Sequence, residues 1–79
     1  MELKELENVS ICITCDTIEQ AELISLTFEK NNISNMAIYK EPYAEVYYVE
    51  KNTKRDKSFI THYDIFEKIF LPSNQPETK

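Results

Sequence analysis

Residues 9–15 alternate between apolar and small polar side chains, which is the period of a β-strand. The apolar side of the alternation consists of Val9, Ile11, Ile13 and Cys15, and the other side consists of Ser10, Cys12 and Thr14. Branched aliphatic side chains suit a pleated surface. The pattern therefore predicts a strand with one face in the core and a second face that is solvated or only thinly covered.

A helical pattern follows directly. One apolar stripe recurs at helical spacing and consists of Ile18, Ala21, Ile24 and Phe28. Asp16 is predicted to cap the start of this helix, with Glu19 completing a capping-box spacing. Asn31-Asn32 is predicted to end it, because Asn tolerates the left-handed conformation that Gly usually supplies and the chain contains no Gly.

The rest of the chain adds shorter patterns. In order, they predict strands at 35–40 and 43–50, a loop at 51–57, a short strand at 58–60, and a helix that starts at Thr61 and stops at Pro72. Glu41-Pro42 separates the two longer strands and predicts an antiparallel hairpin. Strands 9–15 and 35–40, joined by a helix, are expected to pair in parallel. The fold class is α+β: a β-α-β-β-(β)-α ferredoxin-like sandwich, with two helices on one face of a sheet of three or four strands.

Length and net charge limit the number of domains and the kinds of partner. Seventy-nine residues allow one domain, which we place at 9–71, between a ragged N-terminal segment (1–8) and a flexible polar tail (72–79). The net charge of −5 disfavours direct binding to nucleic acid or to an anionic membrane. No apolar run approaches the ~18 residues that span a bilayer. The acidic N-terminus lacks the apolar core of a secretory signal, so we expect a cytoplasmic protein.

Residues 15–33 resemble the first βα unit of small GlnB-like signal-transducing domains. The matching positions are Thr17, Ala21-Glu22-Leu23-Ile24 and Ile33, while Phe28-Glu29 stands for a Leu-Glu pair and Asn32 for a Gly. The resemblance covers about a quarter of the chain and implies a ferredoxin-like fold. It implies no functional residue.

Candidate catalytic and metal-binding residues are few. Cys12 and Cys15 form a C-x-x-C, but alternation sends them to opposite faces of a strand, and no second pair completes a zinc site. His62 is the only histidine; Asp16 and Asp64 could give it acid–base partners, yet no nucleophile is placed beside it. We therefore predict no catalytic residue, no metal site, no cofactor and no enzyme activity.

Partner-binding residues are predicted in two places. The loop 51–57 has a local charge of +3, which leaves −8 for the remainder; it is either a solvated hairpin tip or, through Lys54 and Arg55, a contact for an anionic partner. Tyr39, Tyr43 and Tyr47 are predicted on the sheet face turned away from the helices. There they either steady the hairpin by cross-strand pairing or form an interface.

These patterns favour a non-enzymatic regulatory or adaptor protein that acts by protein–protein contact. A homodimer through the uncovered sheet face is one form of that hypothesis, and Leu23 and Leu26, which fall outside the helix stripe, offer a competing surface. The first alternative is a small acidic inhibitor that mimics nucleic acid and blocks a basic cleft of an enzyme. The second is a ferredoxin-like sensor of a small ligand. The sequence does not identify the partner.

Overall fold

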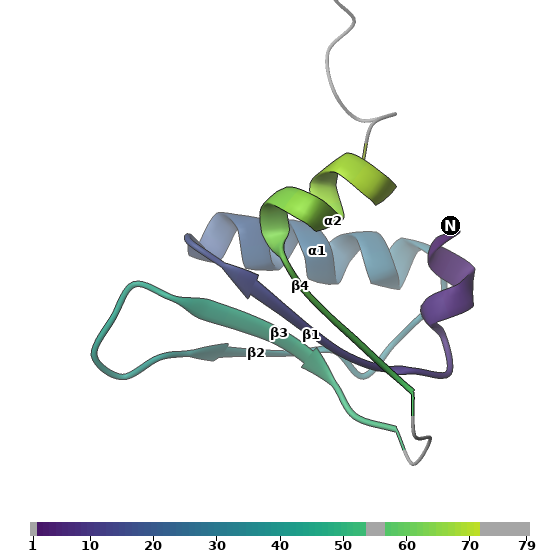
Figure 1. Cartoon of the computed structure of the whole chain (residues 1–79), viewed down its shortest axis with the longest axis horizontal. Helices are drawn as coiled ribbons and strands as arrows, with labels where there is room; N and C mark the ends of the chain where they lie inside the picture. The colour runs from purple at the N-terminus through teal and green to yellow at the C-terminus, as the bar shows by residue number, and fades with distance from the viewer. Residues whose placement is uncertain (1, 54–56, 72–79) are drawn as a thin grey trace, which may run out of the picture.

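The structure is a computed structural model that describes residues 2–53 and 57–71 (Figure 1). Its elements are the 3₁₀ turn η1 (Leu3–Leu6), β1 (Ser10–Cys15), α1 (Ile18–Lys30), β2 (Ala37–Lys40), β3 (Tyr47–Lys51), β4 (Ser58–His62) and α2 (Tyr63–Phe70). The predicted order of strands and helices is confirmed. The short fourth strand is present and runs on to His62.

The four strands form one mixed sheet in the order β2-β3-β1-β4. β3 is antiparallel to both β1 and β2, whereas β4 is parallel to β1. Both helices lie on the same side of this sheet (Figure 1), which confirms the predicted α+β sandwich. We call the two sides the helix-covered face and the open face.

One predicted pairing is wrong. β2 does not lie beside β1, because β3 turns back from β2 and inserts between them. β4 follows β3 in the chain but pairs with the other side of β1, parallel to it. A ferredoxin-like sandwich would place its last strand after the second helix, whereas here β4 comes before α2.

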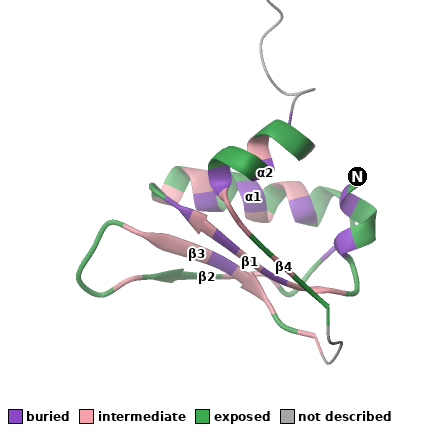
Figure 2. Cartoon of the chain, in the orientation of Figure 1, coloured by how far each residue is buried: buried purple, intermediate pink, exposed green. Residues whose placement is uncertain are grey.

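The core fills the space between the helices and the helix-covered face (Figure 2). Its largest fully buried side chains are Phe28, Phe66, Ile13, Ile24, Ile33, Leu71, Val49 and Cys15. Phe28 of α1 and Phe66 of α2 meet with ring centroids 5.6 Å apart, which ties the two helices together. Leu3 and Leu6 of η1 are buried in the same core, so the segment predicted to be ragged belongs to the packed body.

The helix ends are close to the predicted positions but differ in detail. Thr17, not Asp16, caps α1: its hydroxyl accepts from the Gln20 N–H at 3.1 Å. α2 begins at Tyr63, two residues after the predicted start at Thr61, and is capped by His62. α1 ends at Lys30 as expected, and Asn32 follows in the left-handed region with φ 63°.

The third strand is shorter than predicted. Residues 41–46 form the connection between β2 and β3, and Lys40 spans that connection by donating to the backbone oxygens of Glu41 and Ala44. Tyr43 therefore lies in a turn and not in a strand. The predicted tail 72–79 lies outside the described residues.

Candidate functional site

The open face of the sheet consists of two rows that cross all four strands. Strand register aligns Ala37, Glu50, Cys12 and Ile60 in what we call the central row. It aligns Tyr39, Tyr48, Thr14 and His62 in what we call the aromatic row. No helix covers either row among the described residues, because α1 and α2 both lie on the other face (Figure 1).

Exposed apolar area on this face lies at its two edges. Ile60 of β4 is 76% exposed and Tyr39 of β2 is 53% exposed. Between them the side chains are half-buried: Tyr48 donates to the Glu41 carboxylate at 3.5 Å, and small residues of β1 fill the centre. The surface is therefore broad, with an apolar group at each end.

Glu50 supplies the charge at the centre of the open face. Its carboxylate accepts from the Cys12 Sγ–H at 3.6 Å. A thiol is a weak donor. The half-buried Glu50 carboxylate therefore keeps the capacity to accept a stronger hydrogen bond from a cationic group.

The predicted partner-binding tyrosines are divided among three environments. Tyr39 lies on the open face, as predicted. Tyr43 is 96% exposed in the β2–β3 connection. Tyr47 was placed on the wrong face: it pairs with Cys15 in the register and packs against the core on the helix-covered side.

Tyr48, Glu50 and Ile60 were missed as candidate residues of the open face. The signal that could have found them is strand register, since each aligns with Cys12 or Thr14, which the alternation of residues 9–15 assigns to that face. Lys54 and Arg55 lie outside the described residues.

The two cysteines separate as predicted. Cys12 is half-buried on the open face, and Cys15 is fully buried on the helix-covered face; both are free thiols. Burial, with smaller effects of the Glu50 charge and hydrogen bond, raises the pKa of Cys12. Burial and the neighbouring Asp16 charge raise the pKa of Cys15 to about 11. A reactive redox pair needs a lowered thiol pKa, so this geometry opposes that chemistry.

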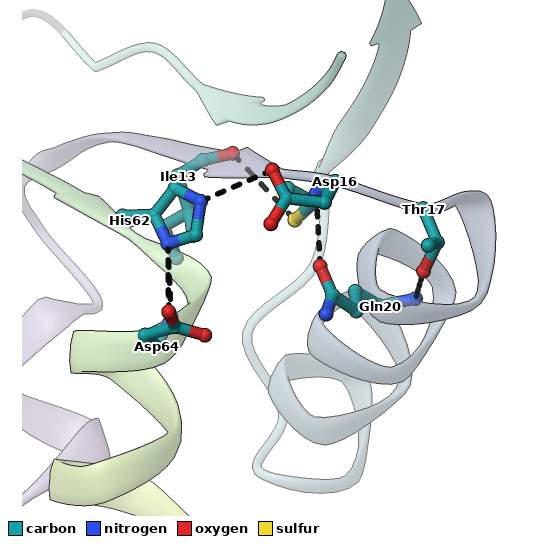
Figure 3. Close-up of polar contacts among 7 residues, drawn as sticks. Ile13, Asp16, Thr17, Gln20, His62 and Asp64 are labelled. Carbon is teal, nitrogen blue, oxygen red and sulfur yellow. Dashed lines mark hydrogen bonds and ion pairs between the residues drawn. The ribbon is translucent and has the colours of Figure 1, made fainter. Parts of the chain in front are cut away.

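His62 joins the starts of the two helices (Figure 3). Its Nδ1 accepts the Asp64 N–H at 3.1 Å, which caps α2 and places the proton of the neutral ring on Nε2. Nε2 lies 3.4 Å from Asp16 Oδ1, at the turn between β1 and α1. Both ring nitrogens therefore have structural contacts, and the arrangement is that of a capping histidine that links two turns.

A polar hollow of about 330 Å³ opens at the end of the sheet where β3 finishes. Its lining is mostly amide and hydroxyl side chains: Glu7, Asn8, Asn32, Ile33, Ser34, Asn35, Lys51, Asn52 and Thr53. Within this lining the Lys51 ammonium donates to the Glu7 carbonyl. Among residues 2–53 and 57–71, no group of three or more His, Cys, Asp or Glu side chains is arranged to hold a metal ion.

Comparison with known proteins gives no match to a family model, to a curated protein or to a solved structure. The resemblance to GlnB-like domains thus stays a prediction from the sequence. No helix within the described ranges is long and apolar enough to cross a membrane.

Proposed function

We propose that this chain is a non-enzymatic regulatory or adaptor protein that binds another protein through the open face of its sheet. The observation that carries the proposal is a sheet face left bare by both helices, with Tyr39 and Ile60 exposed at its two edges. Exposed Tyr supplies a large contact area at low entropic cost and is enriched at interfaces. The setting we propose is the cytoplasm, in keeping with two free thiols.

The chemistry of the face favours one kind of partner. Glu50 is the charged side chain of the central row, and within residues 2–53 and 57–71 its hydrogen-bond donor is the Cys12 thiol. A partner surface that presents a Lys or Arg between apolar side chains would pair with Glu50 while covering Tyr39 and Ile60. The hollow beside Cys12, Glu50 and Ile60 on this face has a volume of about 170 Å³, below the ~300–1,000 Å³ of typical ligand sites, so a protein surface fits the face better than a small molecule.

The two alternatives have less support. An inhibitor that mimics nucleic acid needs its carboxylates gathered on one face, but η1, α1, the β2–β3 connection and α2 each carry some of them. A sensor of a small ligand would use the polar hollow at the end of β3. A rise in melting temperature with a ligand, abolished by changes in the hollow, would favour the sensor.

The test combines partner capture with a binding measurement on the purified pair. Tyr39→Ser/Tyr48→Ser is expected to weaken binding at least tenfold, a loss of about 1.4 kcal/mol. Tyr43→Ser is the matched control, because it removes a more exposed tyrosine outside the face. Glu50→Gln is expected to weaken binding most at low salt, since it removes an attraction that salt screens.

Equal affinity for wild type and Tyr39→Ser/Tyr48→Ser would overturn the open-face proposal. Neutralising Lys54 and Arg55 together tests the second predicted contact. If only that change weakens binding, the partner uses the basic loop.

A further inference from the structure

Within the described residues, β4 forms an edge of the sheet, and its own five residues lack the charged and proline side chains that usually prevent pairing with another strand. Edge strands in natural proteins commonly contain Lys, Pro or a bulge. Ser58–His62 contains neither a proline nor a Lys, Arg, Asp or Glu residue, and no strand lies beyond it in the described sheet. The opposite edge is guarded: β2 has four residues, ends in Lys40 and runs into Glu41-Pro42.

One hydrogen bond shows which peptide groups of β4 point towards β1 and which point towards the free edge. The Ser10 N–H donates to the Lys57 carbonyl at 3.0 Å, which sets the phase of the parallel ladder between β1 and β4. Residues of a strand alternate between bonding one neighbour and facing the other side. Phe59 and Thr61 therefore bond towards β1, and Ser58, Ile60 and His62 direct their peptide groups towards the free edge.

We propose that a second copy of this chain pairs with β4 edge to edge, antiparallel, about a two-fold axis at Ile60. This register sets Ile60 opposite Ile60 of the second copy and Ser58 opposite its His62. The strand is self-complementary in that register because an apolar residue meets itself and no like charges face each other. The two open faces then form one continuous surface on a sheet of eight strands.

Further apolar area adjoins this edge. β4 passes directly into α2, which packs over β1 and β4. An open hollow with Leu6, Val9 and Phe59 in its lining lies beside the start of β4, between Glu5 and Lys57.

The size of the contact sets the expected strength. Pairing of two five-residue strands is small beside a standard interface of roughly 1,600 Å². The apolar hollow beside the start of β4 adds to it without making it an obligate dimer. We therefore expect a dimer that dissociates at roughly tens of micromolar.

Cross-linking tests the register. In a Cys12→Ser background, which removes the thiol that neighbours position 60, Ile60→Cys is expected to form a disulfide-linked dimer under mild oxidation. Opposed residues in an antiparallel pair lie about 5.5 Å apart, within disulfide range. Ser58→Cys in the same background is the matched control, because it faces position 62 of the second copy and is too far from its own equivalent to link. Equal linking of the two variants, or none, would refute the proposed pairing.

Sedimentation of the unlinked protein gives a second measure. Ile60→Lys is expected to shift the protein to monomer, since two like charges would then meet at the two-fold axis. Tyr39→Lys adds the same charge to the same open face at the other edge and is expected to leave the dimer intact. A wild-type monomer throughout this concentration range would overturn the proposal. Neither result depends on partner binding, so failure here and failure of the proposed function are distinguishable.

Discussion

At the scale of single residues, the two cysteines show how strand alternation divides neighbouring side chains. Cys12 and Cys15 are three positions apart, yet one faces the open side of the sheet and the other is fully buried beneath the helices. Burial is the main cause of the raised pKa of both thiols, and it acts more strongly on Cys15. This places the buried thiol among the groups that make the stability of the protein depend on pH at the alkaline end.

The free energy of unfolding is expected to fall above pH 9 because of Cys15. Folding raises the pKa of Cys15 from 9.0 to about 11, so the folded chain holds this proton more tightly than the unfolded chain. The stabilisation is complete below pH 9 and is lost as pH rises towards 11, and its full size is roughly 3 kcal/mol. Urea unfolding at about pH 8 and about pH 10, under reducing conditions, measures the decline. Cys15→Ala is expected to flatten it, whereas Cys12→Ser should leave most of it; equal slopes in wild type and Cys15→Ala would contradict the assignment.

At the scale of elements, the sequence predicted the features that depend on neighbouring residues. It did not predict the features that depend on pairing between residues far apart in the chain. β1 and α1 were predicted closely because alternation, the apolar stripe and the Asn pair are local signals. The faces of β3 were not predicted correctly. Tyr47 and Tyr48 lie on opposite faces, and alternation places an acidic residue on each of them: Glu45 with Tyr47, and Glu50 with Tyr48. Register with β1 decides the question, and that pairing is not visible in either strand alone.

The end of α1 shows a local signal that worked. The Ile33 N–H donates to Phe28 O at 2.9 Å and the Asn32 N–H to Glu29 O at 3.0 Å, which together form a Schellman motif. Asn32 occupies the left-handed position with φ 63°, where the GlnB-like pattern has Gly. Ile33 is buried and anchors the turn to the core.

The left-handed conformation of Asn32 in this motif is expected to affect the free energy of unfolding. Asn32→Ala is expected to lower the free energy of unfolding by about 1 kcal/mol, because an alanine Cβ is unfavourable at positive φ. Asn32→Gly is expected to match or exceed wild type, since Gly adopts this conformation without a steric cost. Denaturant titrations of the three proteins provide the comparison. If Ala and Gly had the same effect, the backbone conformation would not be the cause.

At the scale of the whole molecule, the sheet is covered on one side only, and the functional proposals both follow from that. The helix-covered side gathers the buried apolar residues of the described chain into one small core. The open side keeps Tyr39 and Ile60 exposed, and the β4 edge stays unguarded. Fold class was predictable because it depends on element order; the open-face residues were predictable only in part, because pairing between distant strands assembles them.

The N-terminal segment also contributes to the core. A domain of this length buries a modest fraction of its surface, so each core side chain matters. Leu6 of η1 is 4% exposed and packs in the common core, although the sequence placed it outside the domain.

Leu6→Ala is expected to lower the free energy of unfolding by about 2–3 kcal/mol, through lost burial and the cavity that remains. Leu26→Ala is the control: Leu26 is 45% exposed on α1, where alanine is a good helix former, so a loss below about 1 kcal/mol is expected. Thermal and urea unfolding of both variants compare the two sites. Equal losses would show that η1 adds no more to the core than an exposed helix position does, and would return the domain boundary to Val9.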